Sequence, residues 1–178
     1  MAFNTFFSST SNEDRKALID SGPTTSANVV LDGIRQVGVR TEDIAYLCVT
    51  HIHLDHAGGA GVLLKDMPRA QVVVHCNGAR HLINPVKLVG SVIQTQGEEA
   101  MTRNGEVVPI EEHRVRVIND GDIIKLSDRQ DLQFIDAPGH CSHQLCIYES
   151  RNGGVFVGDA VGNFAAEEEI LEPVTPPP

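Results

Sequence analysis

The sequence predicts a single α/β domain, and three observations lead to this prediction. The chain has 178 residues, a length that suits one domain with a substantial core. Two short apolar runs, residues 45–49 and 71–75, each end on a histidine or on a histidine-rich stretch. A buried strand that ends on polar side chains is the usual arrangement of a site in an α/β protein. The apolar residues between Val29 and Val37 recur with helical spacing, which predicts an amphipathic helix packed on a sheet.

The first half of the chain predicts strands that alternate with helices. A strand at residues 17–19 leads into Asp20-Ser21-Gly22-Pro23, whose residue types are typical of turns. Gly38 suits the end of the amphipathic helix. Further helices are expected from Gly59 to a stop before Pro68, and then at residues 78–83 and 85–96.

The second half predicts mainly strands. Residues 96–112 are polar and predict a loop with some helix, and strands follow at 115–118, 123–126 and 132–135. Asp120-Gly121 is a hairpin signal, so the first two of these strands are expected to pair. A second hairpin is expected around Asn152-Gly153-Gly154.

Residues 50–59 read Thr-His-Ile-His-Leu-Asp-His-Ala-Gly-Gly and predict a metal site. Imidazole and carboxylate are ligands that zinc, iron and manganese accept. His51 and His53 are two residues apart, so at a strand end they project to the same side. Asp55 and His56 follow where the chain is expected to turn, and they can point to a second position nearby. The alternative is a solvated, histidine-rich loop.

Composition and charge argue against several classes of function. The formal net charge of −10 argues against a general phosphate-binding surface, although it does not exclude a small basic pocket. Tryptophan is absent and aromatic residues are few, so nucleic acid is not an expected partner. The sequence contains neither a run of about 20 apolar residues nor a secretory signal, so no membrane association is expected. The four cysteines show no CxxC spacing, and a reduced, cytoplasmic setting is the expectation.

Four motifs in order resemble the metallo-β-lactamase superfamily, and within it the glyoxalase II-like hydrolases. They span residues 18–159 and comprise Leu18-Ile19-Asp20-Ser21-Gly22, the stretch at 50–59, Ala137-Pro138-Gly139-His140 and Phe156-Val157-Gly158-Asp159. The resemblance implies a four-layer αβ/βα sandwich that is incomplete at its C-terminal end. Its two mixed sheets would face each other, with helices outside and metals at one edge. Asp20 is then open to two interpretations, a support behind the metals or a turn-capping residue.

The resemblance also implies the ligands and the reaction. His51, His53 and His140 would form one metal site, and Asp55, His56 and Asp159 a second, with Asp159 bridging the two ions. Two zinc ions are expected, with iron or manganese as alternatives. A metal-bound hydroxide would attack the carbonyl of a small-molecule thioester, ester or lactone. Asp55 would orient this nucleophile and accept its proton.

One departure from the family pattern keeps two other functions open. The family supplies a late histidine to the second site, whereas this sequence has no histidine after His143. The chain is therefore expected to be a fragment or a truncated form. One alternative is a mononuclear iron enzyme similar to persulfide dioxygenases, with His51, His140 and Asp159 as ligands. The other is a truncated metal-binding domain without turnover.

The remaining polar residues near the motifs carry weaker predictions. His75 is interpreted as an ordinary strand-end histidine rather than a substrate contact, and Asp136 as a turn residue. His143 is expected in the pocket or behind the ligands, with a plain polar loop residue as the alternative. Cys141 is not expected to bind metal. The predicted domain boundaries are a variable N-terminal segment at 1–14, a metallo-β-lactamase-like domain at 15–165 and an acidic, proline-rich tail at 166–178.

Overall fold

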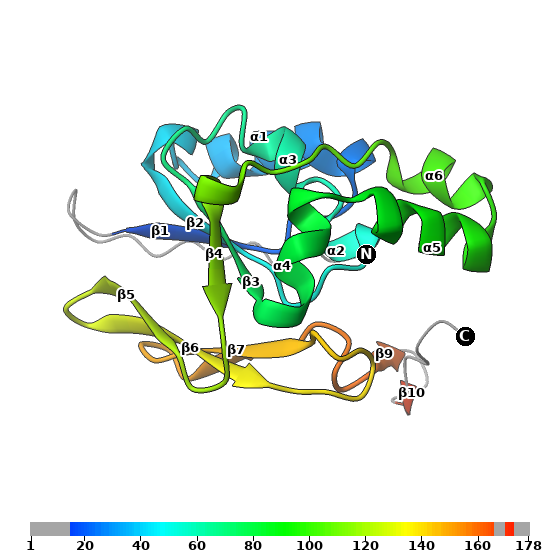
Figure 1. Ribbon diagram of the computed structural model, residues 1–178. Helices are drawn as coiled ribbons and strands as arrows, with labels where there is room; N and C mark the ends of the chain where they lie inside the picture. Colours follow the sequence, from blue (N-terminus) through cyan, green and yellow to red (C-terminus); the bar gives the residue numbers. More distant parts are fainter. Residues whose placement is uncertain (1–14, 166–169, 173–178) are drawn as a thin grey trace.

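Two stacked four-stranded sheets form the centre of the molecule (Figure 1). The computed structural model describes residues 15–165 and 170–172. One sheet has the strand order β1-β2-β3-β4 and is parallel, and the other has the order β5-β6-β7-β8 and is antiparallel. The predicted α/β class with two facing sheets is therefore confirmed.

The parallel sheet is the more deeply buried of the two. Val72, Val73 and Val74 in its third strand have no exposed surface, which explains why this run is apolar without alternation. Both faces of the strand are covered, one by helices and one by the other sheet. The strands of this sheet are β1 (Lys16–Ile19), β2 (Ile44–Cys48), β3 (Gln71–His75) and β4 (Val115–Ile118).

The helices cover the outer face of the parallel sheet (Figure 1). The amphipathic helix predicted around residues 29–37 is α1, and its buried residues include Val30, Leu31 and Ile34. The expected helix after Gly59 is preceded by one further helical turn, α2, which carries part of the metal motif. The helices are α1 (Ala27–Gln36), α2 (Leu54–Ala57), α3 (Ala60–Leu63), α4 (Cys76–Ile83), α5 (Val86–Gln96) and α6 (Glu99–Asn104). Short 3-10 turns lie at Thr24–Ser26, Thr41–Asp43 and Glu112–Arg114.

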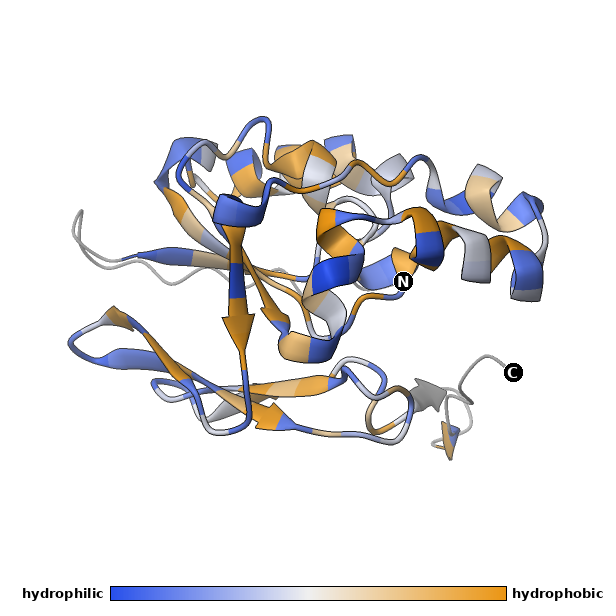
Figure 2. Cartoon of the chain, viewed as in Figure 1, coloured by the Kyte–Doolittle hydropathy of each residue, from blue (hydrophilic) through white to orange (hydrophobic). Residues whose placement is uncertain are grey.

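The antiparallel sheet buries one face against the parallel sheet. In its first strand Ile124 and Leu126 are buried, whereas Ile123 and Lys125 are exposed, and apolar residues line both sheets (Figure 2). This alternation is expected for a sheet with one covered face. The strands are β5 (Ile123–Ser127), β6 (Gln130–Asp136), β7 (Leu145–Glu149) and β8 (Gly154–Phe156), and the predicted hairpin around Gly153 joins the last two.

The arrangement of helices and sheets agrees with the predicted incomplete αβ/βα sandwich, but the strand directions within the sheets differ from the prediction. Within residues 15–165 and 170–172, helices, parallel sheet and antiparallel sheet form three successive layers, and no helix covers the outer face of the antiparallel sheet. The sheets were expected to be mixed, but each is purely parallel or purely antiparallel. The reason is that every crossover through a helix joins strands of the first sheet, whereas short turns join those of the second.

The hairpin predicted at Asp120-Gly121 is wrong. The chain does turn there, but β4 pairs with β3 in the parallel sheet, whereas β5 pairs with β6 in the antiparallel sheet. The Gly121 amide donates a hydrogen bond to the carbonyl of Phe134 on β6, so the turn already belongs to the second sheet. A turn signal reports a reversal of the chain, and the burial of Ile118 and Ile124 between the sheets determines which strands pair.

The ends of the domain are described only in part. The predicted variable segment at 1–14 lies outside the described residues, as do 166–169 and 173–178. Within the predicted tail, β10 (Ile170–Glu172) pairs antiparallel with β9 (Asn163–Ala165). The domain boundaries therefore stay a prediction. Among the described helices, none is long and apolar enough to cross a bilayer.

The packing of α3 gives a test of the fold. A methyl group on Gly61 would clash with the carbonyl oxygen of Val108, in the segment that follows α6. We expect Gly61→Ala to lower the free energy of unfolding by about 1–3 kcal/mol in chemical denaturation, because neither backbone can move freely. Gly33 in α1 has open space where a methyl group would lie, and it is the control. Gly33→Ala should raise the free energy of unfolding by about 0.5–1 kcal/mol. Equal stability of Gly61→Ala and the wild type would contradict this packing.

Candidate metal centre

The candidate ligands meet where strands of both sheets end. His51 and His53 follow β2, and His140 lies in the loop between β6 and β7. Asp159 follows β8. The Leu145 amide donates to the carbonyl of Thr50, which ties the antiparallel sheet to the end of β2. The carboxyl ends of parallel strands are the common place for a site in an open α/β sheet.

Three imidazoles converge as the first predicted metal site requires. The ligand atoms of His51, His53 and His140 lie within 4.8 Å of one another. Nε2 of His140 is 2.8 Å from Nδ1 of His53. Nε2 of His51 is buried and has no hydrogen-bond partner among the described residues. A buried polar atom without a partner is costly, and three converging neutral nitrogens suit a divalent metal. The residues therefore fit the metal that the sequence predicts.

Asp159 lies between this group and a second one. Its Oδ2 is 3.4 Å from Nε2 of His140 and 3.9 Å from Nε2 of His51. Its Oδ1 is 3.3 Å from Nε2 of His56. His51, His56 and Asp159 therefore form a second group of possible ligands. This position between two groups agrees with a bridging carboxylate, which stays a prediction.

Asp55 lies at the edge of the second group. Its Oδ2 is 3.8 Å from Nε2 of His56, and its side chain is 47% exposed. The tight groups of possible ligands do not include it. Its predicted roles as a ligand and as a proton acceptor therefore stay predictions, and its exposure leaves it accessible to a substrate and to water.

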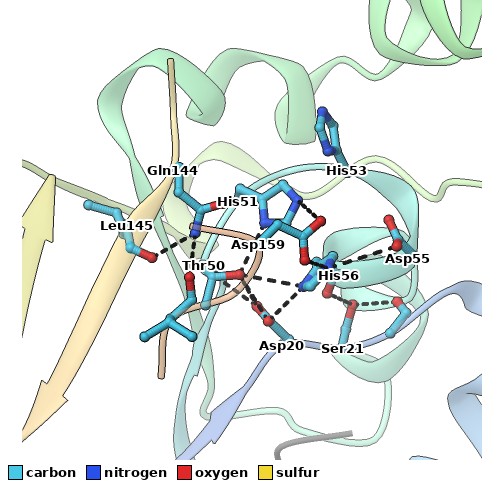
Figure 3. A network of polar contacts seen from close by, with 12 residues as sticks. Asp20, Ser21, Thr50, His51, His53, Asp55, His56, Gln144, Leu145 and Asp159 are labelled. Atoms are coloured by element: carbon cyan, nitrogen blue, oxygen red, sulfur yellow. Dashed lines mark hydrogen bonds and ion pairs between the residues drawn. The ribbon is translucent and has the colours of Figure 1, made fainter. Parts of the chain in front are cut away.

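Asp20 supports the centre from behind (Figure 3). Its Oδ1 accepts a hydrogen bond from the Thr50 amide at 2.7 Å, and its Oδ2 accepts one from the Thr50 hydroxyl at 2.9 Å. Nδ1 of His56 lies 2.9 Å from the same Oδ2. Asp20 has a φ of 56°, in the left-handed region. Of the two interpretations that the sequence left open, the structure supports the one in which Asp20 orients a metal-site histidine.

Burial and neighbouring charges divide the histidines into two kinds. Burial, followed by the nearby imidazoles, strongly lowers the pKa of His51. His51 is therefore neutral and has a lone pair available for a metal. Burial also tends to lower the pKa of His56, but hydrogen bonds to Asp159 and Asp20 outweigh it and raise the pKa to about 10. The hydrogen bond to His56 is also the main reason why the pKa of Asp159 is lowered. In the metal-free chain, a protonated His56 thus joins the two carboxylates.

Cys141 and His143 form a side group next to His53. The Cys141 Sγ is 3.1 Å from Nδ1 of His143, and the two residues form a third group of possible ligands with His53. Burial raises the pKa of the Cys141 thiol to about 11 and lowers that of His143 to about 4. A protonated thiol and a neutral imidazole can therefore share a hydrogen bond. His143 borders the cavity described below, as the sequence predicts.

His75 pairs with Asp136, an interaction that was not predicted from the sequence. Nε2 of His75 is 3.2 Å from Oδ1 of Asp136, and Nδ1 of His75 accepts the amide of Asn77 at the start of α4. This pair joins the end of β3 to the end of β6. It is structural, as expected for His75, but Asp136 does more than form a turn. No sequence signal links the two residues, because they lie far apart in the chain on different sheets.

Several of the candidate metal ligands line one large cavity. It has a volume of about 1120 Å³. His53, Asp55, His140 and Asp159 form its polar end. Side chains of α4, α5 and α6 form the opposite wall. A cavity of this size, with convergent polar groups at one end, is typical of a small-molecule site.

The support by Asp20 can be tested by metal affinity. We expect Asp20→Asn to weaken zinc binding by about 10–100-fold, because an amide cannot accept from both Thr50 and His56 as the carboxylate does. Asparagine tolerates the left-handed backbone, so the change should be confined to the side chain. The measurement is competition with a chromophoric chelator. Asp32→Asn, at an exposed carboxylate of α1, should leave the affinity unchanged. Equal affinities for the two variants would refute a role for Asp20.

Comparison with known sequences links the chain to metallo-hydrolases. The sequence profile of the metallo-beta-lactamase superfamily matches residues 8–177. The probable metallo-hydrolase YqjP of Bacillus subtilis is 23% identical over 175 residues, which cover 89% of this chain and 53% of YqjP. The human acyl-coenzyme A thioesterase MBLAC2 is 29% identical over 119 residues, which cover 63% of this chain and 39% of MBLAC2. The uncharacterized B. subtilis protein YobT is 24% identical over 161 residues, which cover 89% of this chain and 64% of YobT. The chain thus spans less than two thirds of each of these relatives.

Solved structures share the same fold. A B3 metallo-beta-lactamase with an active-site glutamic acid superposes with a TM-score of 0.61 and 26% identity, covering 78% of this chain and 48% of that one. The metallo-beta-lactamase MIM-1 from Novosphingobium pentaromativorans has a TM-score of 0.59 and 27% identity, covering 82% and 50%. The resemblance inferred from the motifs is confirmed by the profile and by these structures: the chain belongs to the metallo-beta-lactamase superfamily.

Proposed function

We propose that this chain is a metal-dependent hydrolase that cleaves a thioester, ester or lactone bond of a small molecule. The observation that carries the proposal is the convergence of His51, His53 and His140, of which His53 and His140 line the cavity and His51 is buried. The buried, unpartnered Nε2 of His51 gives this group a reason to hold a cation. Because Asp159 and His56 lie directly beside it, a second cation is supported as well.

The first group supplies the ligands of one ion, and the second ion takes its ligands from the second group together with Asp55, which lies beside His56. His51, His53 and His140 would hold the first ion, and His56, Asp159 and Asp55 the second. Zinc suits the imidazole-rich set, and iron or manganese are alternatives. When bound, such ions lower the pKa of water to about 7 and polarise a carbonyl oxygen.

The protein itself supplies orientation, a proton acceptor and a binding wall. Asp20 and Thr50 hold His56 in one orientation. Asp55 is half exposed at the cavity's polar end, where it can accept the proton that the attacking water loses. Ile52, Leu54, Leu88 and Val92 line the cavity and can contact the apolar part of a substrate.

Two relatives favour carbonyl substrates and, among these, thioesters. YqjP is named a probable metallo-hydrolase, and MBLAC2 an acyl-coenzyme A thioesterase. The sequence identity of this chain to either relative is too low to imply a shared substrate, and the chain spans only part of each relative. They therefore support the reaction class of the proposal, and a thioester is the first substrate to test.

Hydrolysis by the zinc-loaded chain tests the proposal. We expect turnover of at least one class in a panel of thioesters, esters and lactones, and loss of turnover on chelation. Asp55→Asn should lower kcat by about 10²–10⁴-fold, because a positioned proton acceptor contributes about that factor. Asp66→Asn, at an exposed carboxylate outside the cavity, is the control. If the folded, zinc-loaded chain hydrolyses none of these compounds, the proposal fails.

The iron alternative has one observation in its favour. Among the described residues, His51 belongs to both groups of possible ligands. If His51 binds the first ion, the second ion keeps only His56 and Asp159, with the half-exposed Asp55 beside them. His51, His140 and Asp159 alone can provide a site for one iron. One iron per purified chain, with oxygen uptake in the presence of glutathione persulfide, would replace the hydrolase proposal. Two zinc ions per chain and no oxygen uptake would remove the alternative.

A further inference from the structure

Helix α5 presents one face to the cavity. Leu88, Ser91, Val92, Thr95 and Gln96 all line it. Their spacing of three and four residues places them on one side of a helix. No residue of α5 is fully buried, although Leu88 packs in part against the core. The helix therefore serves as one wall of the cavity, and most of this face is accessible from it.

Three cationic side chains border the same wall. Arg80 lies on α4, Lys87 on α5 and Arg103 on α6, and all three line the cavity. The carboxylates that line the cavity are Asp55 and Asp159, both at the metal end. The cavity therefore has a polar end with the candidate ligands and a second region with three positive charges, although the whole chain has a net charge of −10.

These cations have no carboxylate partners in the described part of the chain. Elsewhere Lys16 and Arg35 form ion pairs with Asp43 and Asp32. No ion pair within residues 15–165 and 170–172 involves Arg80, Lys87 or Arg103. An exposed cation without a partner is common on a surface. Three such cations from three helices around one cavity form a local positive field that attracts anions.

His81 lies close to two of these cations. Nε of Arg80 donates a hydrogen bond to Nε2 of His81 at 3.2 Å, so His81 accepts as a neutral ring and holds the guanidinium in place. Burial, followed by the charges of Arg80 and Lys87, lowers the pKa of His81. Arg80 and Lys87 therefore act on the same small region.

We propose that Arg80, Lys87 and Arg103, here called the cationic arm, bind an anionic group of the substrate remote from the reacting carbonyl. The anion is a phosphate or a carboxylate, and Leu88 and Val92 contact the segment that joins it to the carbonyl. The substrate that we infer is a thioester whose thiol part is long and anionic, and this identification rests on the proposed hydrolase function. Anion binding by the arm itself is independent of turnover.

Steady-state kinetics with three thioesters of one acyl group test the arm. The three thiols are coenzyme A, which carries phosphates, glutathione, which carries carboxylates, and N-acetylcysteamine, which is neutral. In the zinc-loaded chain with Arg80→Gln, Lys87→Gln and Arg103→Gln combined, we expect KM to rise about 10-fold or more for at least one anionic substrate, since each exposed contact contributes a few-fold. The kcat values, and the KM of the neutral substrate, should stay within about two-fold, because the arm lies away from the reacting atoms.

The comparison identifies the anion and includes a control. If the triple variant has a larger KM only for the coenzyme A thioester, the arm binds a phosphate. If its KM is larger only for the glutathione thioester, the arm binds a carboxylate. The control variant Lys125→Gln, at an exposed cation of the antiparallel sheet, should leave the KM of all three thioesters unchanged. An equal change for all three substrates, or no change for either anionic one, overturns the proposal. Circular dichroism and zinc content verify that the triple variant is folded and loaded.

Direct binding separates this inference from the proposed function. Titration calorimetry with desulfo-coenzyme A and with ophthalmic acid, which lack a thiol that could bind zinc, requires no turnover. We expect at least one to bind the wild type, with an affinity that decreases with added salt, and to bind the triple variant about 10-fold or more weakly. Binding without hydrolysis of any thioester, ester or lactone would leave the arm in place and refute the hydrolase function. No binding of either compound would overturn the arm even if hydrolysis is observed.

Discussion

The carboxylate of Asp20 is the constraint on which the candidate centre depends. Because β1 and β2 are parallel neighbours with Ile19 opposite Cys48, Asp20 and Thr50 follow at adjacent strand ends. Asp20 there accepts both hydrogen bonds from Thr50 and contacts His56. One side chain thus fixes the start of the histidine-rich loop and the orientation of a ring in its helical turn. The left-handed backbone at Asp20 costs about 1–3 kcal/mol, which the surrounding contacts must offset.

This arrangement makes the metal-free centre unfavourable in a specific way. His51 is completely buried and neutral, and its Nε2 has no hydrogen-bond partner among the described residues. Nε2 of His140 and Nδ1 of His53 face each other at 2.8 Å, so one of them must donate a proton to the other. A cation that accepts all three lone pairs removes both problems at once, and its binding energy adds to the stability of the fold. A metal bound here would therefore link its affinity to the stability of this part of the molecule.

The sequence predicted the parts that depend on local pattern. The α/β class, most strands and helices, and the cluster at His51 and His53 follow from periodicity and spacing over a few residues, whereas His140 and Asp159 were placed only through the family resemblance. Pairing between distant segments could not be predicted. The turn at Asp120-Gly121 was correct as a turn and wrong as a hairpin, because burial between two sheets decides which strands pair. The cationic arm could not be predicted from the sequence either, since only folding brings its three helices to one cavity.

The residues that line the cavity come from two structurally different parts of the molecule. The metal end is built on strand ends whose neighbours are fully buried, so changes there disturb the core. The opposite wall is α5, which buries none of its residues and can accept substitutions at little cost in stability. In the proposed hydrolase, the residues that select the substrate would thus be separate from those that hold the metal. In a chain of net charge −10, the three cations on that wall also give an approaching anion one favourable place to bind, in the same cavity as the candidate metal centre.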